Sequence, residues 1–143
     1  MDGTTSYRLL TDAIGGVPAA LIIRCAKGVP EVYIHVADYV QPELGGGHTI
    51  RLKFDALTAR IESWEQSTDS KSLFSLFPSL MLYRMIKSKR MLFEFTPYEK
   101  PKRLITFNVS GLETALKPMA GSCGYPDRKD DFLPTDPFPE LDP

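Results

Sequence analysis

The chain has 143 residues, of which 43% are hydrophobic and 24% charged, as in one ordinary globular domain. Its net charge of −1 argues against a dominant role in nucleic-acid binding, because phosphate binding requires a clustered positive excess. No stretch approaches the roughly 18 consecutive apolar residues of a membrane span, so we expect no membrane-spanning segment.

The sequence predicts a single domain, residues 20–123, between two end segments. Residues 1–19 are expected to form an N-terminal arm or an edge strand. They open on an acidic and polar stretch, without the basic residues and apolar run of a signal peptide. We therefore expect a cytoplasmic protein if the sequence is complete, and a periplasmic one if it is a mature form with an added methionine.

Short apolar and alternating runs predict the strands. Residues 20–26 are β-branched and bounded by Gly and Pro, and residues 31–36 alternate, so the two runs are expected to form a hairpin. Residues 48–55 alternate most clearly, which is typical of an antiparallel sheet with one face in water. Further strands are expected at residues 59–66, 91–95 and 103–109.

Three consecutive glycines, Gly45 to Gly47, precede the alternating run at residues 48–55. Glycine-rich loops of this kind can hold a phosphate, but the Lys-Ser/Thr pair of a phosphate-binding loop does not follow. The glycines therefore predict the tip of a hairpin.

Two helices are predicted in the second half of the chain. Apolar residues at helical spacing indicate an amphipathic helix over residues 78–87. A second helix is expected to open at Ser110, with Glu113 completing a capping box, and to end near Pro118. The predicted fold is α+β, with an antiparallel sheet or sandwich of about six to seven strands and two short helices.

The single tryptophan, Trp64, lies among polar neighbours in a predicted strand. We expect it to be buried over the core with its indole N–H hydrogen-bonded. The alternative is an exposed tryptophan that contributes to partner binding.

The sequence offers no grouping that indicates catalysis or a metal site. His35, Asp38 and His48 are the only plausible metal ligands, but His35 and Asp38 are expected on opposite faces of a strand. No serine lies in a Gly-x-Ser-x-Gly motif, and Cys25 lies within an apolar strand that disfavours a thiolate. We therefore expect no catalytic residues, no metal, no cofactor and no enzyme activity.

Residues 124–143 form an acidic, proline-rich tail with six acidic and two basic side chains. Such a composition does not build a core of its own. Four apolar residues are spaced along it and are candidates for binding a protein partner: Phe132, Leu133, Phe138 and Leu141. A docking arm and a solvated tail both remain open.

The two cysteines, Cys25 and Cys123, are too far apart for a Cys-x-x-Cys redox or zinc motif. Either they form a bridge that closes a loop of nearly the whole domain, or they are two separate thiols in a reducing compartment. The residues alone leave both alternatives open.

A series of segments between Leu21 and Tyr125 resembles the VasI/TagO-like family of type VI secretion-associated accessory proteins. The segments that carry the resemblance are Leu21–Cys25, Glu31–Ile34, His48–Asp55, Ser63–Asp69, Leu92–Tyr98, Phe107–Glu113 and Cys123–Tyr125. Family members are secreted or envelope proteins with a cysteine at both places, so the resemblance implies a Cys25–Cys123 disulfide if the chain is exported. It implies no catalytic residues.

The function expected from this resemblance is that of a non-enzymatic accessory protein of a secretion-system or envelope assembly, which binds a protein partner. The N-terminus and the acidic tail depart from the family pattern. The alternative expectation is a phage-encoded structural or inhibitory protein that binds its partner through the tail.

Overall fold

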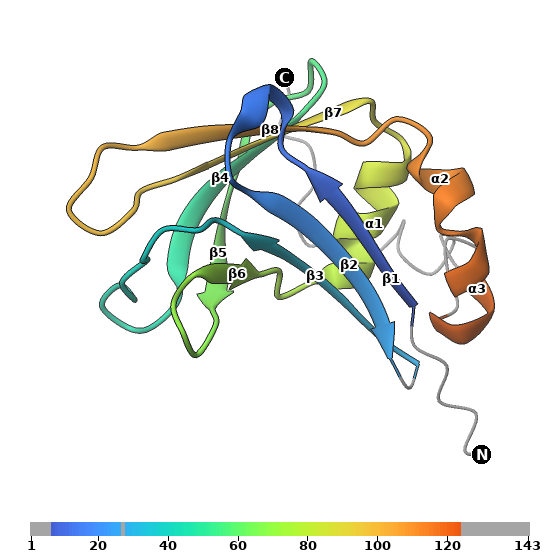
Figure 1. Ribbon diagram of the computed structural model, residues 1–143, viewed down its shortest axis with the longest axis horizontal. Helices are drawn as coiled ribbons and strands as arrows, with labels where there is room; N and C mark the ends of the chain where they lie inside the picture. The colour runs from blue at the N-terminus through green and yellow to red at the C-terminus, as the bar shows by residue number, and fades with distance from the viewer. Residues whose placement is uncertain (1–6, 27, 124–143) are drawn as a thin grey trace.

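The alternating pattern at residues 48–54 forms a strand with one buried and one exposed face. In the computed structural model, which describes residues 7–26 and 28–123 (Figure 1), β4 (His48–Phe54) buries every second residue. Ile50, Leu52 and Phe54 are at most 2% exposed, while the residues between them face water.

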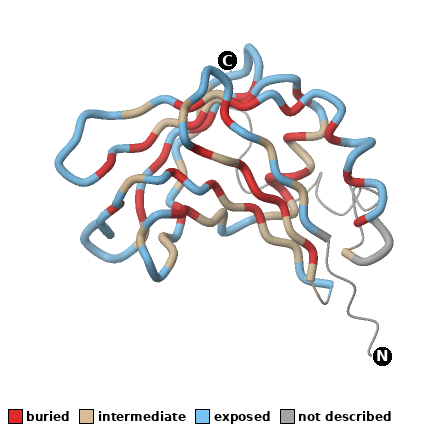
Figure 2. Tube along the Cα trace, in the orientation of Figure 1, coloured by how far each residue is buried: buried red, intermediate tan, exposed pale blue. Residues whose placement is uncertain are grey.

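The described part of the chain contains eight strands in one antiparallel sheet, with the order β1-β2-β3-β6-β5-β4-β7-β8. The other strands are β1 (Tyr7–Asp12), β2 (Ala20–Ala26), β3 (Val29–His35), β5 (Arg60–Gln66), β6 (Ser72–Phe74), β7 (Arg90–Phe95) and β8 (Arg103–Asn108). Buried positions also alternate along β7 and in part of β3, β5 and β8, whereas β2 buries three consecutive residues, Leu21 to Ile23 (Figure 2). A short 3₁₀ turn, η1 (Ile14–Gly16), joins β1 to β2 and lies against β8.

The sheet bends over itself, so that β1, β2 and β3 lie in front of β4, β7 and β8 in Figure 1. One core cluster contains buried side chains of both halves, such as Leu21 and Ile34 of the first and Phe93 and Phe107 of the second. Burial between the two halves is the main source of stability, at about 25 cal/mol for each Å² of apolar surface removed from water.

Three short helices in the described residues cover one end of the bent sheet: α1 (Pro78–Ile86), α2 (Leu112–Ala115) and α3 (Lys117–Cys123). Helix α1 packs on β3 and buries Leu82 and Met85, as their helical spacing predicts, together with Leu80 and Met81. Helix α3 lies against β2, where a disulfide joins Cys25 to Cys123 with 6.2 Å between the Cα atoms. The bridge implied by the resemblance is therefore present.

The antiparallel, β-rich α+β fold is confirmed, but the expected strand number was too low. Strand β6 has three residues, too few for a visible alternation, yet it joins the two halves of the sheet by pairing with β3 and β5. Residues 7–12, within the expected arm or edge strand, form β1 at one edge of the sheet.

The prediction that Gly45–Gly47 form a hairpin tip is wrong. Strand β3 pairs with β2 and β6, whereas β4 pairs with β5 and β7, so the segment between β3 and β4 crosses from one half of the sheet to the other. A tight glycine-rich turn looks the same in the sequence whether or not the flanking strands are neighbours.

The predicted start and end of the second helix are also wrong. Gly111 is the residue before α2, with φ of 75°, and the Ser110 N–H donates to Asn108 Oδ1 (3.0 Å) instead of completing a capping box. Pro118 does not end a helix but lies in the first turn of α3, a position that suits proline because the N–H there has no helical acceptor.

The candidate partner-binding residues Phe132, Leu133, Phe138 and Leu141 lie outside the described residues. Of the helices that are described, none combines the length and the apolar character needed to traverse a lipid bilayer.

Candidate functional site

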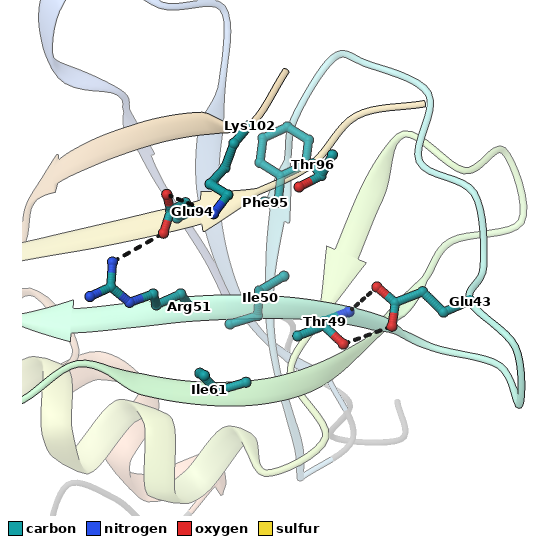
Figure 3. Close-up of a pocket in the computed structure, with 9 residues that line it drawn as sticks. All are labelled: Glu43, Thr49, Ile50, Arg51, Ile61, Glu94, Phe95, Thr96 and Lys102. Carbon is teal, nitrogen blue, oxygen red and sulfur yellow. Dashed lines mark hydrogen bonds and ion pairs between the residues drawn. The ribbon is translucent and has the colours of Figure 1, made fainter. Parts of the chain in front are cut away.

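Strands β4 and β7 separate at one end, and a hollow of about 240 Å³ opens between them (Figure 3). Their pairing runs from Phe54↔Met91 to Arg51↔Glu94 and then stops. The hollow is lined by residues of β4, β7 and β5, of the loop before β4, and of the turn between β7 and β8. They are Glu43, Thr49, Ile50, Arg51, Ile61, Glu94, Phe95, Thr96 and Lys102.

The backbone of Thr49 points into this opening. The Asp55 N–H donates to the Arg90 carbonyl at the start of β7 (3.1 Å). Residues two apart on a strand direct their backbone groups to the same neighbouring strand, so the backbone of Thr49, six residues before Asp55, also faces β7. Continuing the register would pair Thr49 with Thr96. That pair is not formed, and within the described part of the chain the Thr96 N–H and C=O make no hydrogen bond.

The Glu43 side chain binds Thr49 in place of the missing Thr96 partner. The Glu43 carboxylate accepts the Thr49 N–H at Oε2 (2.9 Å) and the Thr49 hydroxyl at Oε1 (2.7 Å). These two hydrogen bonds hold the pKa of Glu43 below its ordinary value, because they favour the ionised carboxylate. The end of β4 is thus closed by a carboxylate instead of a strand.

The glycine-rich loop brings Glu43 to this position. The Glu43 N–H donates to the Gly47 carbonyl and the Gly46 N–H donates to the Glu43 carbonyl, both at 2.8 Å. Gly47 has φ of 77°, and a Cβ there would come within 2.5 Å of Ser63 Oγ. The backbone conformation therefore favours glycine at this position, and any larger residue would also displace the Ser63 side chain.

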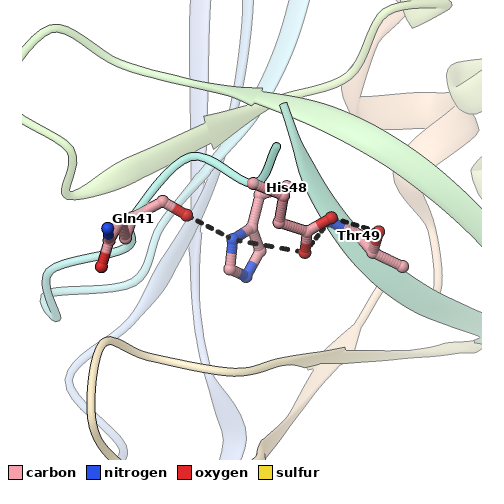
Figure 4. Close-up of polar contacts among 4 residues, drawn as sticks. Gln41, His48 and Thr49 are labelled. Atoms are coloured by element: carbon pink, nitrogen blue, oxygen red, sulfur yellow. Dashed lines mark hydrogen bonds and ion pairs between the residues drawn. The ribbon is translucent and has the colours of Figure 1, made fainter. Parts of the chain in front are cut away.

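His48 lies on the inner side of the same turn (Figure 4). Its ring is buried, and Nδ1 is 3.2 Å from the Gln41 carbonyl oxygen and 4.0 Å from Glu43 Oε2. The contact with a carbonyl assigns the proton to Nδ1. Nε2 is then buried without a hydrogen-bond partner in the described residues. His48 thereby ties the backbone before the glycines to the start of β4.

The charges around the hollow are arranged about Glu94. Its carboxylate lies 3.2 Å from Arg51 Nη1 and 3.9 Å from Lys102 Nζ. The side chains of Arg51 and Lys102 are 59% and 65% exposed, so the two ion pairs contribute little to stability and leave both cations accessible.

Two exposed tyrosines lie beside the segments that line the hollow. Tyr39 and Tyr98 are 49% and 45% exposed, and their rings meet edge to face with centroids 5.5 Å apart. The Tyr98 N–H also donates to the Tyr39 carbonyl (2.8 Å). Leu44, next to Glu43, is fully exposed. We call Tyr39, Tyr98 and Leu44 the rim.

The three residues considered as metal ligands do not come together. Asp38 pairs with Lys100 and Arg103, His48 contacts the Gln41 carbonyl, and His35 contacts Ser72. Across residues 7–26 and 28–123, no group of three or more His, Cys, Asp or Glu side chains has the geometry to hold a metal ion.

Among the described residues, His35 Nδ1 lies within hydrogen-bond distance of a serine hydroxyl, Ser72 Oγ (3.2 Å). The two residues are direct cross-strand partners of β3 and β6, so the register of the sheet accounts for their contact. They lie on strands that do not line the hollow.

The prediction for Trp64 is confirmed. The ring is fully buried, and its indole N–H donates to Glu62 Oε1 (2.9 Å). Glu62 itself lies on the inner side of β5, with Oε2 3.8 Å from Arg60 Nε. The alternation on β5 thus brings two charged side chains under the sheet together with the tryptophan.

Sequence reasoning missed the hollow and the rim. The one local signal is Glu43, an acidic residue next to three glycines and six positions before the threonine that it binds. Comparison with models of protein families, with curated proteins and with solved structures found no match.

Proposed function

We propose that this chain is a non-enzymatic accessory protein of a secretion-system or envelope assembly, and that it binds a protein partner through the rim and the hollow. The observation that carries the proposal is a pair of exposed tyrosines in contact, on the two segments that flank an interrupted strand pair, with the exposed Leu44 directly after Glu43 in one of these segments. Tyrosine is enriched where proteins bind one another, because it contributes a large contact area with few rotatable bonds.

Rigid support of the rim favours the same function. The Tyr39 backbone is bonded to Tyr98, and the preceding Asp38 is paired with Lys100 and Arg103. Tyr39 and Tyr98 are therefore held before a partner arrives, which reduces the conformational entropy lost on binding. Binding residues on loops that a sheet holds in place are a common arrangement.

The resemblance to the VasI/TagO-like family is the reason for proposing that the assembly is a secretion system or an envelope complex. The Cys25–Cys123 disulfide supports this part of the proposal, because such bridges persist in oxidising compartments such as the bacterial periplasm.

Partner capture from extracts of the host, quantified by mass spectrometry, tests the proposal. Replacing Tyr39 and Tyr98 by alanine should reduce recovery of the specific partner about tenfold or more, because exposed tyrosines at interfaces contribute roughly 1–2 kcal/mol each. Leu57→Ala is the matched control, since Leu57 is equally exposed (49%) and does not line the hollow. Equal loss in the control and the tyrosine variant would contradict a specific role of the rim.

Docking through the tail residues Phe132, Leu133, Phe138 and Leu141 is the alternative, as for a phage-encoded structural or inhibitory protein. Deleting residues 126–143 separates the two proposals. Under the main proposal, the shortened chain retains the partner and remains sensitive to the tyrosine substitutions. If the deletion alone abolishes capture, the tail is the binding element.

A further inference from the structure

The geometry points to a carboxylate-binding subsite at the end of β4, which takes an acidic side chain from an extended segment of the partner in place of Glu43. The inference deepens the proposed function, and it rests on that function for the choice of a protein as the source of the carboxylate.

The first support is the pair of donors on Thr49. Its N–H and its hydroxyl both donate to one carboxylate, at 2.9 and 2.7 Å. Hydrogen bonds to an ionised acceptor are about twice as strong as those between neutral groups. The position is therefore selective for a carboxylate, and Glu43 marks where the group sits.

The second support is that Glu43 can leave. Its side chain is 46% exposed, and among the described residues the only charged contact is with His48 Nδ1, at 4.0 Å. It lies on a turn whose three glycines all have positive φ and whose flanking leucine is fully exposed. Rotation of the half-exposed Glu43 side chain to another rotamer uncovers the Thr49 donors without disturbing the core positions of β4.

The charges that line the hollow also favour an anionic occupant. The hollow is lined by two acidic residues, Glu43 and Glu94, and by two basic ones, Arg51 and Lys102. Once Glu43 has moved out, the remaining three side chains carry one net positive charge. A partner carboxylate restores neutrality, and the exposed cations Arg51 and Lys102 are free to approach it.

The backbone of Thr96 favours an extended segment as the occupant. Across the opening from Thr49, the Thr96 N–H and C=O make no hydrogen bond within the described residues. A strand-like segment satisfies these groups by main-chain pairing, as in strand addition to a sheet. Ile61, 71% exposed at the border of the hollow, provides apolar contact for a neighbouring side chain of the segment.

The first experiment follows the backbone amide at position 49 by NMR in the full chain while acetate is added. In Glu43→Ala, the Thr49 amide should shift saturably, and in the wild type it should not, because Glu43 already fills the position. Adding Thr49→Val to Glu43→Ala should weaken acetate binding about fivefold, the effect of one lost hydrogen bond of about 1 kcal/mol. No shift in Glu43→Ala, or equal shifts in both proteins, would overturn the subsite.

Two substitutions on the same face of β4 provide a matched control in the Glu43→Ala background. Arg51→Gln should weaken acetate binding a few-fold, because Arg51 lines the hollow. Lys53→Gln should leave it unchanged, because Lys53 lies two residues further along β4 and does not line the hollow. Equal effects would mean that general surface charge attracts the anion, and the subsite would be rejected.

The second experiment replaces acetate by two blocked peptides, acetyl-Leu-Glu-Leu-Val-amide and its Gln counterpart. The Glu peptide should bind Glu43→Ala about tenfold more tightly than the Gln peptide does, because the neutral amide oxygen of Gln accepts weaker hydrogen bonds than a carboxylate does. Its shifts should include both Thr49 and Thr96. Equal binding of the two peptides, or binding of acetate but of neither peptide, would overturn the proposed occupant. The peptide experiment tests the subsite alone. The role of the rim in partner binding is tested separately by the Tyr39 and Tyr98 variants.

Discussion

Asp38 and Arg103 join the crossover between β3 and β4 to the hairpin between β7 and β8. The Asp38 side chain is 10% exposed, and its carboxylate accepts hydrogen bonds from Arg103 and, at 3.0 Å, from Lys100. Two segments that are more than 60 residues apart in the chain are thereby held side by side. This contact positions the two tyrosines of the rim, because Tyr39 directly follows Asp38 and Tyr98 lies two residues before Lys100.

Replacing Asp38 by alanine should lower the free energy of unfolding by about 1–3 kcal/mol, because Arg103 would be left partly buried without its anion. Urea unfolding measures the loss. Lys100→Gln is the control and should cost at most about 0.5 kcal/mol, since the Lys100 side chain is 59% exposed. A loss in Asp38→Ala no larger than that in the control would contradict the structural role of the pair.

Removing the Cys25–Cys123 bridge should destabilise the domain strongly. The bridge closes a loop with a sequence separation of 98 residues, for which the loss of unfolded-chain entropy corresponds to about 4.7 kcal/mol, with about 2–4 kcal/mol commonly measured. The double variant Cys25→Ala, Cys123→Ala should therefore unfold at lower urea concentration than the oxidised wild type. Reduced wild type should match the variant. Equal stability of all three proteins would contradict the account.

Glu62 should be important for the burial of Trp64. In Glu62→Ala the indole N–H loses its acceptor in the core, which costs about 1–3 kcal/mol. Glu62→Gln keeps an acceptor oxygen and should cost less. Glu65→Ala is the matched control, because Glu65 lies on the exposed face of the same strand. Urea unfolding followed by tryptophan fluorescence would show whether Glu62→Ala alone is destabilised.

Glu43 should make stability depend on pH in the acid range. Its pKa is lowered in the folded protein by the Thr49 hydroxyl, by the Thr49 amide and, more weakly, by His48. A lowered folded pKa contributes stability that is present above the unfolded value and is lost as pH falls below about 4.3. The difference in unfolding free energy between wild type and Glu43→Gln should therefore be larger at pH 6 than at pH 3. A difference that grows on acidification would contradict the assigned contact.

Local patterns predicted the strands well, because alternation at β4 and the β2–β3 hairpin are decided by neighbours in the sequence. The order of the strands depends on distant pairs, such as Arg51 with Glu94, and no local pattern encodes them. The hollow arises where this distant pairing stops, so it was not predictable from either strand alone. The disulfide became an expectation only through the family resemblance, since its spacing left two alternatives open.

The central claim is that a protein partner binds at the rim and the hollow. Hydrogen–deuterium exchange of the full chain, with and without the captured partner, tests it most directly. We predict slower exchange on binding in residues 39–49 and 94–103, with no change in the β2–β3 turn at the opposite end of the fold. Unchanged exchange in residues 39–49 and 94–103, together with slower exchange on other strands, would contradict the claim.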